Sequence, residues 1–169
     1  MEQEEETVRC LALPLVGDQL LVPNAVVAEV FAAGAISPVP DGPDWLLGNL
    51  AWRGEVLPVV CMEAALGGTR LETGTRSKIV VISALTASES LKYYAVLVQG
   101  IPHQVLAGSS TVTPETPING ARPFVAVDVQ VEGGQAFVPD LDAVEQALLD
   151  VAELWHRAGS DDGGGDEIG

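Results

Sequence analysis

One stretch of the sequence, residues 48–60, constrains the fold more than any other. Two apolar, strand-like runs flank Arg53-Gly54-Glu55 there, a sequence typical of a tight β-hairpin turn in which Gly54 takes a positive φ angle. Pro58 lies within the second run and has no amide hydrogen to donate, so we expect that strand at an edge or in a bent part of a sheet. The stretch therefore predicts a small barrel with a turn that displays Arg53.

Short apolar segments rich in Val, Leu and Ile recur along the whole chain, and 18 glycines and 11 prolines help to separate them. This spacing is typical of all-β sandwiches and barrels. A faint internal repeat between residues 20–30 and 94–105 favours two similar halves. Residues 16–19 and Gly133-Gly134 are typical of hairpin turns. The expected strands are 9–15, 20–22, 26–31, 46–52, 56–62, 79–82, 93–98, 103–106, 124–131 and 135–138.

One long helix is predicted at residues 141–157, with Asp140 as its N-cap and apolar residues at helical spacing. The apolar stripe of this helix must pack against the barrels. A short helical turn is expected at 63–66, and exposed loops are expected at 69–77 and 107–123.

The composition allows one domain of ordinary size, or two small barrels with a common core, in 169 residues. The net charge is −16, and eight of the 24 acids lie in residues 1–7 and 159–169. We expect these two segments to be acidic tails, the second of them disordered. An acidic protein repels phosphate backbones and anionic lipids, so nucleic acid and membrane surfaces are poor partners. The partners are therefore expected to be proteins.

Cys10 and Cys61 both lie in apolar, strand-like surroundings, which favours free structural thiols in a reduced, cytoplasmic protein. The first residues are acidic, whereas a signal peptide begins with a basic segment followed by an apolar one. No apolar run approaches the roughly 18 residues that a membrane span needs. We therefore expect neither export by a standard signal nor membrane insertion.

The sequence contains no common catalytic motif: it has no Gly-x-Ser-x-Gly elbow, Walker loop, HExxH or strand-linked GxGxxG. His103 and His156 are far apart, with no cysteine or aspartate at ligand spacing, so no metal site is predicted. A thiol hydrolase built from Cys61 and His103 stays open on spacing alone, although apolar surroundings would raise the pKa of Cys61 and reduce its reactivity. The sequence favours a protein that is not an enzyme and has no cofactor.

The pattern Gly-x-x-x-x-Arg-Gly-x-aliphatic-x-Pro-Val at residues 48–59 resembles the signature of the CheW-like domain, the coupling module of bacterial chemosensory arrays. Val27-Ala28-Glu29-Val30 is similar to the Val-x-Glu-aliphatic segment of that family, and the resemblance covers residues 8–150. It implies a mainly β fold of two SH3-like five-stranded barrels that share a core, followed by a C-terminal helix. The implied domain, two intertwined barrels, spans residues 8–158.

Some positions depart from the usual family pattern. Cys61-Met62 stands where the family usually has Asp-Leu, and Gln99 stands where it tends to have Asp. Together with Tyr93-Tyr94, these residues resemble the accessory CheW-like proteins of the twitching-motility chemosensory system, the ChpC type, more than the principal coupling proteins.

The resemblance implies a non-catalytic adaptor in chemotaxis or twitching motility. Such an adaptor would couple the cytoplasmic tip of a methyl-accepting chemoreceptor to the regulatory domain of a CheA-type histidine kinase. The partner-binding residues implied by the resemblance are Val27, Glu29, Gly48, Arg53, Ile79 and Val80.

Arg53 is the expected interface anchor, because a guanidinium on a rigid turn can make a charge-assisted contact to a carboxylate of a partner helix. The alternatives are that Arg53 is a solvated turn residue and that Glu29 is an ordinary solvent-facing residue. Trp52 is expected to pack in or beside the core. Two other functions stay open, a scaffold that binds the kinase alone and a small-molecule-binding β-barrel, although barrels this small are normally filled by side chains.

Overall fold

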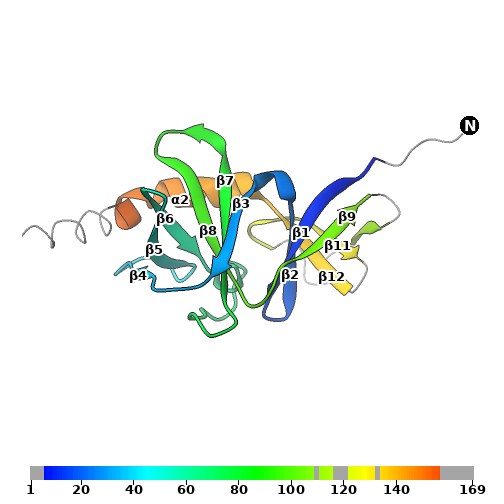
Figure 1. Ribbon diagram of the computed structural model, residues 1–169, viewed down its shortest axis with the longest axis horizontal. Coiled ribbons are helices and arrows are strands. Elements are labelled where there is room, and N and C mark those ends of the chain that lie inside the picture. The colour runs from blue at the N-terminus through cyan, green and yellow to red at the C-terminus, as the bar shows by residue number, and fades with distance from the viewer. Residues whose placement is uncertain (1–5, 109–110, 116–121, 132–133, 157–169) are drawn as a thin grey trace, which may run out of the picture.

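The computed structural model describes residues 6–108, 111–115, 122–131 and 134–156 (Figure 1). The helical elements are η1 (Asn24–Val26), α1 (Met62–Ala65) and α2 (Leu141–Asp150). The strands are β1 (Val8–Leu15), β2 (Asp18–Pro23), β3 (Val27–Ala32), β4 (Ser37–Pro38), β5 (Leu46–Trp52), β6 (Glu55–Val60), β7 (Lys78–Ser88), β8 (Leu91–Val98), β9 (His103–Ala107), β10 (Val112–Glu115), β11 (Val125–Val131) and β12 (Gly134–Pro139).

The strands form two sheets, which lie side by side in Figure 1. The first sheet has the order β10-β11-β12-β2-β1-β9, and the second has the order β3-β7-β8-β6-β5-β4. The chain thus begins in the first sheet, builds the second, and returns to complete the first. The predicted mainly β fold with two barrel-like halves is confirmed. In the described part of the chain, each sheet has six strands where five were expected. The additional strand is the short edge strand β10 in the first sheet and the short edge strand β4 in the second.

Side chains on β7 alternate between two cores, as the two-residue period of a strand requires. Ile79 and Val81 pack in a cluster inside the second sheet. Val80 and Ile82 pack in a central cluster that also receives side chains from β1, β2 and α2. A third cluster lies within the first sheet. The two halves therefore share a core, as expected.

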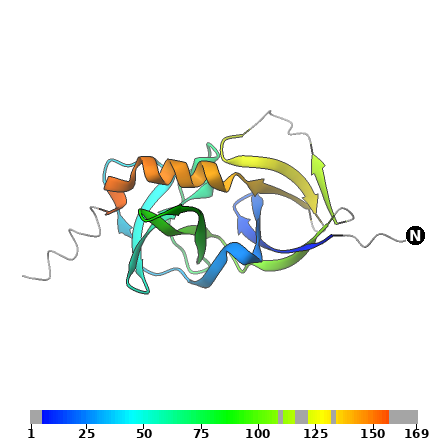
Figure 2. The ribbon, with the colours of Figure 1, turned by 90° about the horizontal axis from the view of Figure 1, so that it is seen from above.

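Helix α2 packs against β7 and β8, and Figure 2 shows it running along one side of the molecule. The predicted N-cap is confirmed, because Asp140 Oδ1 accepts a hydrogen bond from Ala143 N at 3.1 Å. The helix is shorter than predicted: it ends at Asp150, Val151 forms a turn, and residues 152–156 are again helical. No helix within the described ranges has the length and apolar character needed to cross a bilayer.

The predicted turn at residues 16–19 is present, with Gly17 at φ 76°. Gly133 of the other predicted turn lies outside the described residues, as do the acidic tails apart from Glu6 and Thr7. The limits of the predicted domain, 8–158, stay a prediction.

Candidate functional site

The turn between β5 and β6 has the geometry of a two-residue hairpin connection. Trp52 pairs with Glu55, and the two central residues both have positive φ, 48° for Arg53 and 79° for Gly54. Positive φ at both central positions defines the type I′ turn, whose twist matches that of the flanking strands. The predicted conformation of Gly54 is confirmed. The turn projects Arg53 outward, with 69% of its side chain exposed.

Arg53 is not free at the tip of this turn, because it forms an ion pair within the chain. Its Nη2 lies 2.9 Å from Oε1 of Glu29 on β3. The same carboxylate oxygen accepts a hydrogen bond from the indole Nε1 of Trp52 at 3.0 Å. Two of the predicted partner-binding residues thus lie in direct contact.

Aromatic rings extend this contact across the surface. The Arg53 guanidinium lies 4.9 Å from the centre of the Trp52 ring, within the range of a cation–π interaction. Trp52 in turn meets Tyr93 of β8 edge to face, with 4.9 Å between ring centres. We call Glu29, Trp52, Arg53 and Tyr93 the Arg53 cluster. Trp52 and Tyr93 also pack against the core of the second sheet, which holds the cluster in place.

The Arg53 cluster has a structural consequence as well. β3 is an edge strand of the second sheet, and its ladder with β7 is irregular between Val27 and Glu29. Side chains of the β5–β6 turn reach this edge through Glu29. The cluster therefore joins two parts of the sheet that are not neighbours in its strand order, which helps to close the barrel.

Three of the predicted partner-binding residues do not lie on an accessible surface, and the prediction is corrected there. Ile79 and Val80 are 0% exposed, one in each of the two cores that flank β7. Gly48 is buried at φ 152°, and a Cβ atom on it would lie 2.0 Å from the carbonyl oxygen of Ser37. These residues support the fold and cannot contact a partner directly in this structure. Val27 is half-buried on the same strand as Glu29.

The cysteines have the surroundings of structural residues. Cys10 and Cys61 are both free and buried, and burial raises the pKa of each thiol. Cys61 lies in the core of the second sheet, whereas His103 begins β9 of the first sheet. The nucleophile and base of the hydrolase alternative are therefore in different sheets. The described residues contain no group of three or more His, Cys, Asp or Glu side chains that could hold a metal ion.

A buried carboxylate that the sequence reasoning missed lies on α2. Glu145 is 0% exposed. It accepts hydrogen bonds from the backbone N–H groups of Leu85 and Thr86, both at 2.8 Å, from Thr86 Oγ1, and from the Tyr94 hydroxyl at 3.2 Å. Burial, and then the nearby Glu145, raise the pKa of Tyr94 well above its ordinary value. The signal for this site was available, because Glu145 lies three residues before Leu148 on the buried stripe of α2.

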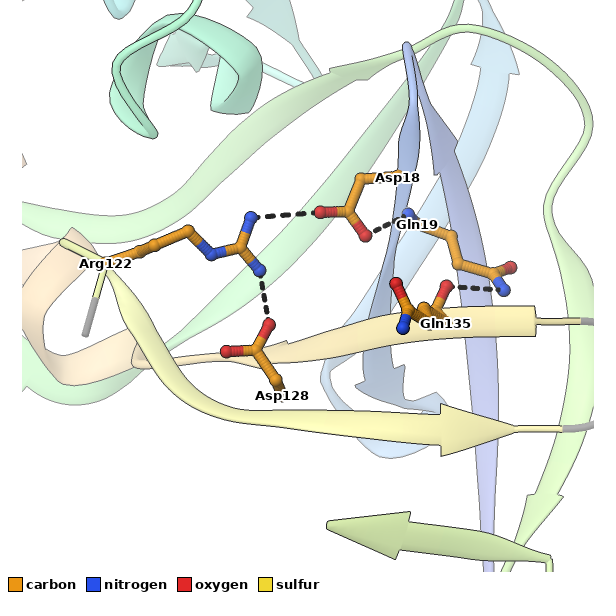
Figure 3. A network of polar contacts seen from close by, with 5 residues as sticks. All are labelled: Asp18, Gln19, Arg122, Asp128 and Gln135. Atoms are coloured by element: carbon orange, nitrogen blue, oxygen red, sulfur yellow. Dashed lines mark hydrogen bonds and ion pairs between the residues drawn. The ribbon is translucent and has the colours of Figure 1, made fainter. Parts of the chain in front are cut away.

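A second polar network joins three strands of the first sheet (Figure 3). Arg122 Nη1 contacts Asp18 of β2 at 3.1 Å, and Nη2 contacts Asp128 of β11. Gln19 Nε2 donates to the carbonyl oxygen of Gln135 on β12 at 3.1 Å. Each terminal nitrogen of the guanidinium, Nη1 and Nη2, thus has its own carboxylate, so Arg122 is engaged within the sheet.

Both the sequence and the fold are similar to those of known proteins. The model of the CheW-like domain matches residues 9–148. Protein FrzA of Myxococcus xanthus is 39% identical over 67 residues, a match that spans 39% of this chain and only 42% of FrzA. Chemotaxis protein CheW of Rhizobium meliloti (strain 1021) is 28% identical over 132 residues, 76% of this chain and 82% of that protein.

Among solved structures, the scaffolding protein TtCheW from Thermoanaerobacter tengcongensis has a similar fold. It aligns with a TM-score of 0.66 at 15% sequence identity, and the alignment covers 83% of this chain and 89% of that one.

Proposed function

This chain belongs to the CheW-like domain family, and from that membership we propose that it is a non-catalytic chemosensory adaptor. It couples the cytoplasmic tip of a methyl-accepting chemoreceptor to the regulatory domain of a CheA-type histidine kinase. The similarity to chemotaxis protein CheW of Rhizobium meliloti, which extends over most of both chains, supports this role. The kind of array, chemotaxis or twitching motility, stays a prediction.

The observation that carries the proposal is the Arg53 cluster. Arg53 is displayed on a type I′ turn. Its guanidinium has five N–H donors, and the contact with Glu29 is made by one nitrogen, Nη2. A carboxylate on a receptor helix can therefore bind beside Glu29, in a charge-assisted hydrogen bond. Trp52 and Tyr93 give the contact an aromatic border, a composition typical of the residues that dominate binding energy at interfaces.

The cluster is also pre-organised for binding. Glu29 and the Trp52 ring already hold the Arg53 side chain in one region, so less rotamer entropy is lost when a partner binds. The site we propose therefore consists of Glu29, Trp52, Arg53 and Tyr93, with Val27 on the adjacent part of β3. Gly48, Ile79 and Val80 support it from within the fold.

Coupling requires that the adaptor bind both partners at once and prefer some of their states over others. If one receptor state binds the adaptor more tightly than another state does, the kinase equilibrium can shift by no more than the difference between these two binding free energies. The cytoplasmic setting of this role is part of the proposal.

One experiment separates the adaptor from its alternative. The full chain is mixed with a soluble receptor-tip fragment and the kinase regulatory domain, and the complexes are resolved by sedimentation. We expect a ternary complex of all three proteins. Without the chain, the receptor fragment and the kinase domain should not sediment together. If the chain binds neither fragment, the adaptor function is wrong.

The alternative is a scaffold that binds the kinase alone. The internal contact between Glu29 and Arg53 favours it, because the proposed receptor anchor already has a carboxylate partner. In the sedimentation experiment, this alternative predicts a complex with the kinase domain and no binding of the receptor fragment. The small-molecule alternative has no comparable support, since apolar side chains fill the core of each sheet.

A further inference from the structure

The buried carboxylate of Glu145 has no part in the proposed receptor site as described so far. Its Oε2 accepts hydrogen bonds from Leu85 N and from the Tyr94 hydroxyl. Its Oε1 accepts from the N–H and from the hydroxyl of Thr86. An ionised carboxylate has about four lone-pair sites and no donor, so these partners fill its capacity. An amide in the same place would turn an N–H group toward at least one of these donors.

The donors lie where the ladder between β7 and β8 breaks, near the far end of a hairpin that extends beyond the other strands of the second sheet (Figure 1). Regular pairing stops at Ser83, opposite Tyr93, and resumes only at Ser88. Residues 84–87 have no partner on β8 in this register and form a bulge, which leaves backbone groups without strand partners. Glu145 supplies acceptors for two N–H groups of this bulge.

Tyr93, a member of the Arg53 cluster, lies at the same break. It precedes Tyr94 on β8, so the two side chains point to opposite faces of the sheet. Tyr94 packs in the central cluster, to which α2 contributes. Tyr93 packs on the core of the second sheet and meets the Trp52 ring at 4.9 Å. One strand thus carries the bond to Glu145 on one face and the aromatic border of the receptor site on the other.

The other supports of Tyr93 are incomplete. The pairing of β8 with β6 begins only at Ala95, beyond Tyr93. The Tyr93 ring also lines an open surface cleft, together with Thr86 and Lys92, so protein does not enclose it on all sides. The place of the ring therefore depends on the course of the β8 backbone. Glu145 fixes this course through hydrogen bonds to both strands of the hairpin.

We propose that Glu145 is a positioning residue of the receptor site: from the opposite face of β8 it sets the place of the Tyr93 ring against Trp52. Its effect on receptor binding rests on the proposed function. Glu145 is 0% exposed, so it acts through Tyr93 and not by contact with the partner. Helix α2 thereby contributes to receptor affinity from inside the fold.

The first test needs no receptor. Glu145→Gln keeps the size of the side chain and introduces a donor. Val144→Ala is the matched control, because Val144 is the preceding residue of α2, is also buried, and lies beside Trp45 and Phe124. In the full chain labelled with nitrogen-15, NMR follows the indole N–H signal of Trp52, which is assigned by its loss in Trp52→Phe. The ring current of Tyr93 acts on this signal, so we expect Glu145→Gln to shift it and Val144→Ala to leave it in place.

The second test is a double-mutant cycle on affinity for the receptor-tip fragment, measured by titration calorimetry. We expect Glu145→Gln to bind about fivefold more weakly, within the usual effect of a residue that acts on a site through others. Val144→Ala should bind as the unchanged chain does. When Tyr93→Leu is already present, adding Glu145→Gln should weaken binding no further, because the residue through which it acts is gone. A loss of stability alone would not produce this dependence on Tyr93.

If Glu145→Gln does not fold, Tyr94→Phe takes its place in both tests, because it removes one bond to Glu145 and should act in the same direction. Three results would overturn the proposal: a Trp52 signal that Glu145→Gln leaves unchanged, equal shifts in Glu145→Gln and Val144→Ala, or a full effect of Glu145→Gln in the Tyr93→Leu background. If the unchanged chain does not bind the receptor fragment, the proposed function fails, and the Trp52 signal alone decides whether Glu145 positions Tyr93.

Discussion

Arg53 Nη2 lies 2.9 Å from Glu29 Oε1, and this contact joins the β5–β6 turn to the edge strand β3. The same oxygen accepts the indole N–H of Trp52. One carboxylate therefore positions both side chains that we propose as the centre of the receptor-binding surface.

The first prediction separates the charge of Glu29 from its role as a hydrogen-bond acceptor. Glu29→Gln keeps an acceptor for Trp52 and loses the ion pair, whereas Glu29→Ala loses both. We expect affinity for the receptor fragment to fall in the order unchanged protein, Glu29→Gln, Glu29→Ala, as measured by titration calorimetry. Exposed ion pairs contribute at most about 1 kcal/mol, so Glu29→Gln should melt close to the unchanged protein. Unaltered binding by Glu29→Ala would show that this carboxylate does not position the site.

The second prediction concerns Gly48, which we assign to the fold and not to the surface. Gly48→Ala places a Cβ atom 2.0 Å from the Ser37 carbonyl oxygen, at a φ angle that L-residues rarely adopt. We expect a loss of more than about 2 kcal/mol in the free energy of unfolding, measured by urea denaturation. Gly34→Ala is the matched control, because its Cβ would have no atom within 4 Å. Similar stabilities of the two variants would contradict the assignment.

The third prediction concerns the pH dependence of stability that Tyr94 confers. Its pKa is raised in the folded state, so the unfolded chain loses this proton first as the pH rises. The contribution of Tyr94 is therefore complete below its ordinary pKa of about 10 and decreases above it. The buried cysteines have raised pKa values and act in the same direction.

Tyr94→Phe isolates this contribution. The variant loses the hydrogen bond to Glu145, so it should be less stable at neutral pH by about 1.5–3 kcal/mol, the usual range for a bond to a charged group. The difference between the two proteins should narrow as the pH rises above about 10 in denaturation experiments. A difference that stays constant or widens with pH would show that Tyr94 ionises at least as easily in the folded protein as in the unfolded one.

Much of the fold followed from local patterns in the sequence. The hairpin at Arg53-Gly54 is marked by its glycine and its flanking apolar runs, and the N-cap at Asp140 by its place before an apolar stripe. The strands β4 and β10 were missed because they are short and contain proline. The end of α2 at Asp150 was also missed. Beyond this end, Asn49 Nδ2 donates to the Trp155 carbonyl oxygen. These two residues are 106 positions apart, so no local pattern in the sequence shows the contact.

The candidate site was harder to predict because it depends on which strands meet. The contact between Glu29 and Arg53 requires that the turn reach the edge strand β3, and no local pattern records this. Ile79 and Val80 were assigned to the surface by resemblance alone. β7 is buried on both faces, so its sequence shows a continuous apolar run and gives no sign of which face a partner could reach.

The fourth prediction tests the central claim, that Arg53 anchors the receptor. Arg53→Asp reverses the charge of an exposed turn residue, so the free energy of unfolding should change little, since surface substitutions usually stay within about 0.5 kcal/mol. Binding to the receptor fragment should weaken by roughly 2 kcal/mol or more, because a charged interface anchor is lost. Arg76→Asp is the matched control, as it reverses the charge of another exposed arginine outside the cluster.

The most direct measurement is a calorimetric titration of the receptor-tip fragment into three proteins, the unchanged chain, Arg53→Asp and Arg76→Asp. The account predicts that Arg53→Asp binds at least about 30-fold more weakly while Arg76→Asp binds normally, and that all three melt at similar temperatures. Normal binding by a folded Arg53→Asp variant, or equal losses in both variants, would contradict it.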